Sequence, residues 1–254
     1  MRLRHILLGG LLWLPLALPA APLELQLCQS DEGDYPWTLP DRAGLNNLLI
    51  ERAARRTGVR IRFHAMPWAR CLFKVSTGDM DGVVGASYRP ERQRIGAYPL
   101  SQGRPDAERR LMRNRYLLYR RTGDTGVQWD GRRLVVSGPV GVPTGYSIAD
   151  TLRRHGATIA QQQRLPARLL QALIVGDLNA VAITAGEGER LLADHDTYQG
   201  RIEPLPLALE EKDFYLVFSH RFRQRHPALT DRLWHALMLE QRSSDWQQEA
   251  ARFR

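Results

Sequence analysis

Residues 82–93, GVVGASYRPERQ, place a hydroxyl and an arginine directly after an apolar segment. Residues 82–86 are expected to form a short buried strand, Ser87 follows it, and Arg92 lies at the start of the next helix. The planar guanidinium of an arginine can hold a carboxylate through two parallel hydrogen bonds. The stretch therefore indicates a carboxylate-binding site. The alternative is that Arg92 caps the helix or pairs locally with Glu91 or another acidic neighbour.

A second candidate is residues 141–150, GVPTGYSIAD, which combine a strand end, a glycine turn and a helix start. Thr144, Tyr146 and Ser147 supply hydroxyl groups there, and the Tyr146 ring could contact a ligand. Ligands of open parallel sheets bind at the carboxyl ends of strands, beside helix N-termini that favour anions. The alternative for Ser147 is a helix cap.

Three aromatic residues stand at predicted strand ends: Tyr35 and Trp37 in DYPWTLP, and Trp68 in MPWARC. Such rings form the apolar walls of small-molecule clefts. Each of them alone is more often core packing. Their position at one edge of the predicted sheet favours a ligand-binding role.

The composition is that of a folded, arginine-rich protein. The chain has 254 residues, 43% of them hydrophobic, and a formal net charge of +9. The arginine pairs are scattered along the chain, and no nucleic-acid-binding module is present, so we expect no nucleic acid partner. The charge slightly favours an anionic ligand. The sequence contains no phosphate-binding loop, nucleophile elbow or His-Glu-x-x-His motif, and we expect no cofactor and no metal site.

Two series of alternating strands and helices position these candidates. The first series is expected at residues 23–28, 46–57, 59–65, 67–77 and 82–86, and the second runs from residue 116 to residue 183. Alternating strands and helices predict an α/β fold with parallel sheets and right-handed crossovers.

The last elements, from residue 214 onward, have no sheet of their own and are expected to return to the first series. This predicts a discontinuous first lobe and a second lobe of residues 105–206, joined by two crossing segments near residues 100–107 and 204–209. The first lobe comprises residues 21–104 and 207–254.

The N-terminus is typical of an export signal, residues 1–20, with Arg2 and Arg4 before an apolar run and a cleavage site at Ala20. A retained membrane anchor is the alternative. Export to an oxidising compartment favours a disulfide between Cys28 and Cys71, the alternative being two buried thiols.

The order of these stretches resembles the amino-acid-binding, family 3 class of bacterial periplasmic solute-binding proteins. The likeness rests on DYPW, PWARCLFKVSTGDMDGVVGASYRPERQ, GVPTGYSIADTLRRHG and LLQALIVGDLNAVAI, and it covers nearly all of the chain after residue 20. The resemblance implies a two-lobed type II periplasmic-binding fold, in which each lobe is a mainly parallel sheet flanked by helices and the crossing segments act as a hinge.

The resemblance also implies roles for single residues. Tyr35 is similar to an aromatic that packs on the ligand, Trp68 to a wall residue and Ser87 to a hydroxyl donor. Arg92 is similar to the arginine that holds the α-carboxylate of the ligand, and Ser147, after the Gly145 turn, to the carboxylate donors of the second lobe.

One departure concerns the α-ammonium group. Where amino-acid binders of this class have an acidic residue, after the strand 178–183, this chain has Thr184. An ammonium closed into a cleft without a counter-charge would be costly to desolvate. Either Glu187 or Glu189 reaches into the cleft, or the ligand is not an ordinary α-amino acid.

The sequence thus favours a monomeric, non-catalytic periplasmic protein that binds a small carboxylate-bearing solute for a membrane permease or a sensor. One alternative is a cyclohexadienyl dehydratase-like enzyme with Glu187 as the general acid. The other is an interaction module that has lost its ligand.

Overall fold

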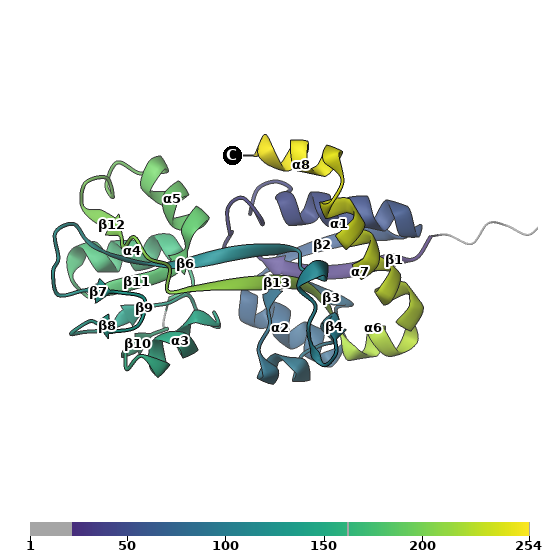
Figure 1. Ribbon diagram of the computed structural model, residues 1–254, viewed down its shortest axis with the longest axis horizontal. Helices are drawn as coiled ribbons and strands as arrows, with labels where there is room; N and C mark the ends of the chain where they lie inside the picture. Colours follow the sequence, from purple (N-terminus) through teal and green to yellow (C-terminus); the bar gives the residue numbers. More distant parts are fainter. Residues whose placement is uncertain (1–21, 162, 254) are drawn as a thin grey trace, which may run out of the picture.

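The structure is a computed structural model that describes residues 22–161 and 163–253. The chain forms two lobes joined by a pair of long strands (Figure 1). The predicted export signal, residues 1–20, lies outside the described residues. Among the described helices, none has the length and apolar character needed to cross a bilayer.

The first lobe is built on three parallel strands, β2 (Arg60–Met66), β1 (Glu24–Ser30) and β3 (Gly82–Ser87). Helices lie on both faces, among them α1 (Leu45–Thr57), α2 (Trp68–Thr77) and α7 (Pro227–Gln241). Alternate residues of its strands face opposite helical layers. Leu25, Leu27 and Val84 pack with α1 and α7, whereas Cys28 and Val83 pack with α2. Its elements are β1 (Glu24–Ser30), α1 (Leu45–Thr57), β2 (Arg60–Met66), α2 (Trp68–Thr77), β3 (Gly82–Ser87), the 3-10 helices η1 (Pro90–Arg94) and η2 (Ala107–Arg109), β4 (Leu100–Ser101), β5 (Arg104–Pro105), α6 (His220–Arg225), α7 (Pro227–Gln241) and α8 (Ser244–Ala251).

The second lobe repeats this plan with the parallel strands β10 (Ile159–Ala160), β9 (Val140–Gly141) and β11 (Ala180–Thr184). Its helices include α3 (Ile148–Arg154), α4 (Pro166–Val175) and α5 (Ala185–Asp194). All five residues of β11 are buried, because Ala180 and Ala182 face α3 while Val181 and Ile183 face α4 and α5. Its elements are β7 (Gln128–Trp129), β8 (Leu134–Val135), β9 (Val140–Gly141), α3 (Ile148–Arg154), β10 (Ile159–Ala160), α4 (Pro166–Val175), β11 (Ala180–Thr184), α5 (Ala185–Asp194) and β12 (Ile202–Pro204).

The two lobes share β6 (Met112–Arg121) and β13 (Glu210–Phe218), which pair antiparallel from Glu210 opposite Tyr116 to Phe214 opposite Met112. β6 continues into the second lobe beside β11, and β13 continues into the first lobe beside β3. The sheet is therefore continuous between the lobes, in the order β10-β9-β11-β6-β13-β3-β1-β2. Figure 1 shows the two long strands running from one lobe to the other.

The crossing strands lie further along the chain than the segments expected from the sequence. Residues 100–107 include the short hairpin β4–β5 instead. The start of β6 has the sequence MRNR, and its two arginines made this segment look like a polar loop rather than a strand. Arg113 and Arg115 are exposed, whereas the alternating Met112, Asn114 and Tyr116 are buried.

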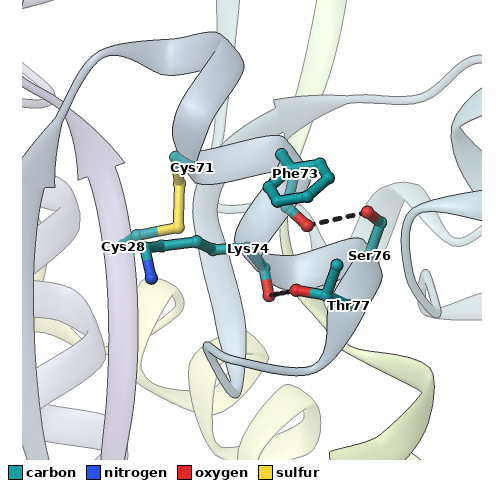
Figure 2. The surroundings of a disulfide bond; sticks show 6 residues. All are labelled: Cys28, Cys71, Phe73, Lys74, Ser76 and Thr77. Atoms are coloured by element: carbon teal, nitrogen blue, oxygen red, sulfur yellow. Dashed lines mark hydrogen bonds between the residues drawn. A yellow bond between two sulfur atoms is a disulfide. The ribbon is translucent and has the colours of Figure 1, made fainter.

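The predicted disulfide between Cys28 and Cys71 is present and joins β1 to α2 (Figure 2). The Cα atoms of the two cysteines are 5.7 Å apart, and both side chains are fully buried. Beyond Cys71, the hydroxyls of Ser76 and Thr77 donate to the carbonyls of Phe73 and Lys74 and close the last turn of α2. The disulfide fixes the two elements whose ends carry Ser30 and Trp68, both of which border the site described next.

Candidate functional site

A cavity lies between the lobes, bordered by the C-terminal ends of β1 and β3, by the crossing strands and by the start of α3. Its volume is about 40 Å³ in this conformation, which is room for a few water molecules. Its apolar wall is formed by Trp68, Val84, Met112, Tyr116, Tyr146 and Phe214. Its polar lining includes Ser30, Asp34, Thr38, Ser87, Arg92 and Ser147. Five of the residues singled out in the sequence therefore meet here: Trp68, Ser87, Arg92, Tyr146 and Ser147.

Arg92 extends from η1 back under the end of β3 and is 6% exposed. Its Nη1 donates to the carbonyl and the hydroxyl of Ser87 at 3.0 and 2.9 Å, and its Nη2 donates to the carbonyl of Gly145 at 3.1 Å. The guanidinium carbon lies 5.7 Å from the Trp68 ring centroid. Glu91, the local partner named in the alternative interpretation, lies 3.6 Å from Arg89 instead. Among the described residues, the hydrogen bonds that position the guanidinium come from neutral groups.

Arg92 keeps its positive charge although burial lowers the pKa of its guanidinium. Within residues 22–161 and 163–253, its hydrogen bonds go to Ser87 and Gly145, and it takes part in no ion pair. A buried cation without a counter-ion favours an anion in the space beside it.

Two hydroxyls meet across the cleft. Ser87 Oγ at the end of β3 lies 2.9 Å from Ser147 Oγ at the start of α3, and both residues are almost fully buried. Ser147 Oγ also accepts from Lys212 Nζ at 3.1 Å, and Glu210 lies 3.1 Å from the same ammonium. Burial lowers the pKa of Lys212. The sequence analysis missed Lys212, although it is one of only two lysines in an arginine-rich chain.

Asp34 is a second residue that the sequence analysis missed. It follows β1, lines the cavity and accepts from Thr184 Oγ1 at 2.7 Å. Asn114 Nδ2 donates to its two carboxylate oxygens at 3.1 and 3.3 Å. Burial raises the pKa of Asp34 to about 7, and the negative charge of Glu187 adds to the effect. The available signal was an acidic residue directly before Tyr35, the predicted cleft aromatic.

Thr184 and Glu187 lie behind Asp34 rather than on the cavity surface. Glu187 is 3% exposed, forms an ion pair with Arg190 at 2.7 Å and accepts from the Tyr35 backbone N–H at 3.4 Å. Glu189 is exposed. Neither glutamate lines the cavity, which was one of the two alternatives drawn from the sequence, because Arg190 of α5 holds Glu187 and Glu189 faces solvent.

Tyr35, Trp37 and Thr144 also lie outside the cavity lining. The Tyr35 hydroxyl donates to the carbonyl of Phe253 at 2.8 Å, so its ring points toward the C-terminus. Trp37 packs against the hydrophobic cores of both lobes. Thr144 Oγ1 donates to the Gln161 carbonyl at 2.9 Å. These three residues make structural contacts that their positions in the sequence did not distinguish from ligand contacts.

Ion pairs between the lobes flank the cavity. Arg164, just before α4, lies 2.7 Å from Asp31, which follows β1. On another side, Arg89 of the first lobe pairs with Asp150 of α3. Together with the contact of Ser87 with Ser147, these pairs hold the lobes together around a small cavity. The structure is therefore a closed arrangement of the two lobes.

No protein-family model matches the chain, and no curated protein matches it in sequence. Solved structures do match. The GluR0 ligand-binding core from Nostoc punctiforme in complex with (L)-glutamate aligns at 15% identity with a TM-score of 0.70, over 90% of this chain and 98% of that one. A histidine kinase sensor domain with similarity to periplasmic binding proteins gives the same identity and TM-score, over 90% and 95% of the two chains.

The chain has the two-lobed type II periplasmic-binding-protein fold. The fold class predicted from the sequence is thereby confirmed. A third match is the ancestral amino-acid-binding protein AncCDT-1, a precursor of cyclohexadienyl dehydratase, at 14% identity and a TM-score of 0.66 over 91% and 95% of the chains. The type II periplasmic-binding fold thus occurs in binding cores, in sensor domains and in a precursor of an enzyme.

Proposed function

We propose that the chain binds a small carboxylate-bearing solute in the cleft between its lobes, as a family 3 solute-binding protein does, without converting it. The observation that carries the proposal is Arg92, a buried cation that lines the cavity and takes part in no ion pair with the described residues. A ligand carboxylate would complete its hydrogen bonding. Ser147, which lines the cavity from the second lobe, is placed to add a contact to the same group.

The setting we propose is the periplasm, reached through the export signal of residues 1–20, with a membrane permease or a sensor as the partner. The structural matches that are named as amino-acid-binding or sensor proteins support this setting. The disulfide agrees with an oxidising compartment.

The test is a thermal-shift screen of the purified protein against amino acids, dicarboxylates and aromatic acids. A ligand selective for the folded state raises the melting temperature by mass action. Arg92→Ala should weaken binding of the best ligand by about 30- to 1,000-fold, because it removes a buried charge partner. Arg94→Ala is the matched control, since Arg94 lies on the same 3-10 helix and is exposed. Equal binding by wild type and Arg92→Ala would refute the proposal.

A second candidate function is catalysis by a general acid in the cleft. Glu187, the candidate from the sequence, is ion-paired and does not line the cavity. Asp34 does line it, and its raised pKa of about 7 is that of a carboxyl group able to exchange a proton near neutral pH. Turnover of prephenate-like substrates by wild type, lost in Asp34→Asn, would support this function over simple binding.

A further inference from the structure

The cavity presents a second charge that the described residues leave without an opposite partner. The carboxylate of Asp34 receives hydrogen bonds from the neutral side chains of Thr184 and Asn114. Within residues 22–161 and 163–253 it forms no ion pair. A carboxylate has about four acceptor positions. In the part of the chain that the structure describes, Asp34 Oδ2 accepts a single hydrogen bond, from Asn114 Nδ2 at 3.3 Å. Asp34 therefore retains acceptor capacity beside the cavity.

Asp34 and Arg92 border the same cavity but do not neutralise each other. Arg92 is bound by Ser87 and Gly145, and Asp34 by Thr184 and Asn114. Two opposite charges that face one enclosed space without meeting are complementary to a molecule with a charge at each end. The aromatic and aliphatic wall between them, including Trp68 and Phe214, would lower the local dielectric and strengthen both contacts.

We propose that Asp34 binds the cationic nitrogen of the ligand while Arg92 binds its carboxylate, so that the solute is a small zwitterionic amino acid. The inference rests on the proposed function and specifies its ligand class. The counter-charge comes from the loop after β1, in the first lobe, and Thr184 at the end of β11 orients it from the second lobe. The absence of an acidic residue at position 184 is thereby compensated by Asp34.

The geometry assigns Thr184 and Asn114 a positioning role. Thr184 Oγ1 and Asn114 Nδ2 donate to the carboxylate and fix its direction toward the cavity. Both donors also favour the ionised form of Asp34, the form that an ammonium group requires. Because Thr184 belongs to the second lobe, its hydroxyl can donate to the Asp34 carboxylate only when the lobes close.

The test is calorimetric titration of amino acids and of the matched acids that lack the amino group: glycine with acetate, L-alanine with propionate, 4-aminobutyrate with butyrate, and L-glutamate with glutarate. The wild type should bind at least one amino acid about 30-fold or more tightly than its matched acid. Asp34→Asn should remove this difference. Asp41→Asn is the matched control, because it makes the same charge change at an exposed position on the same loop.

The outcomes separate the inference from the proposed function. If the matched acids bind as tightly as the amino acids and Arg92→Ala abolishes binding, carboxylate binding stands and the role of Asp34 is wrong. If no member of the panel binds, or if Arg92→Ala has no effect, the proposed function fails and the inference fails with it. A loss of binding by Asp34→Asn supports the role of Asp34 when the melting temperature of the variant is at least that of the wild type, because the variant is then folded.

The pH dependence of amino acid binding by Thr184→Val tests the positioning role, because a purely structural role of Thr184 would leave this pH dependence unchanged. Removing the Thr184 hydroxyl raises the pKa of Asp34, so the pH at which amino acid binding is half-maximal should shift upward while binding at high pH is retained. An unchanged pH profile would overturn the positioning role. Proton release by the wild type on binding tests the ion contact without any substitution.

Discussion

Thr184 Oγ1 of the second lobe donates to Asp34 Oδ1 of the first lobe at 2.7 Å. This hydrogen bond joins the end of β11 to the loop after β1 at the edge of the cavity. It connects the residue that departs from the amino-acid-binding pattern with the acidic residue that compensates for it.

Binding of an amino acid should release protons near neutral pH. The pKa of free Asp34 is about 7, and an ammonium partner lowers it, so the carboxyl group loses its proton on binding. Glu187 is the charged neighbour that raises this pKa, and Tyr116 and Tyr146 stay neutral because burial raises the pKa of each. Calorimetry at pH 7 in buffers of different ionisation enthalpy should report release of about half a proton. Proton uptake would contradict the ion contact.

Asp34→Asn should stabilise the ligand-free protein at alkaline pH. The folded-state pKa of about 7 exceeds the usual value of 3.8, so the folded protein holds a proton that the unfolded chain loses between these values. The free energy of unfolding is therefore not reduced by Asp34 below about pH 4, and it falls as the pH rises to about 7. At pH 8 the free energy of unfolding of Asp34→Asn should exceed that of the wild type by about 1 to 4 kcal/mol. Near pH 4 the two proteins should be equally stable. Urea unfolding at both pH values measures this, and a less stable variant at pH 8 would be contrary to it.

Reduction of the Cys28–Cys71 disulfide should lower the free energy of unfolding. The bond closes a loop with a sequence separation of 43, for which the chain-entropy relation gives about 4 kcal/mol. Urea unfolding with and without dithiothreitol measures the difference, and the Cys28→Ala/Cys71→Ala variant, unaffected by reductant, is the control. Because β1 and α2 carry parts of the cavity edge, ligand affinity should fall as well. An unchanged unfolding midpoint would show that the bond is not formed in solution.

The ion pair of Arg164 with Asp31 should favour the closed arrangement. Both side chains are partly exposed, so the pair contributes about 0.5 to 1 kcal/mol. Arg164→Ala should weaken ligand binding by about two- to five-fold and enlarge the radius of gyration measured by small-angle X-ray scattering. Arg168→Ala, at an exposed position of α4, should change neither value. Equal effects of the two variants would exclude a role for this pair in closure.

The alternating α/β plan was predictable because short strand-like runs alternate with helical patterns, several of which end at a glycine. Gly58, Gly78 and Gly176 all end helices in the left-handed conformation, at φ of 72°, 77° and 90°. The crossing strand β6 was harder to predict, since a strand that links two lobes exposes one face. Its exposed arginines gave it the composition of a loop.

The part of the site that could be predicted consists of residues that directly follow a strand or begin a helix. Arg92 and Ser87 follow one strand directly, and Trp68 begins the helix after another, so their meeting follows from the sheet topology. Asp34 was not predictable, because its role depends on Thr184, 150 residues further along the chain. Tyr35 was expected to pack its ring on the ligand, since nothing in the local sequence shows that its hydroxyl donates to the Phe253 carbonyl.

The most direct test of the account is a crystal structure of the protein with the tightest-binding member of the amino acid panel. The account predicts a ligand carboxylate within hydrogen-bond distance of the Arg92 guanidinium and an ammonium group at the Asp34 carboxylate, between closed lobes. A guanidinium turned into solvent, or a ligand whose carboxylate lies away from Arg92, would contradict it.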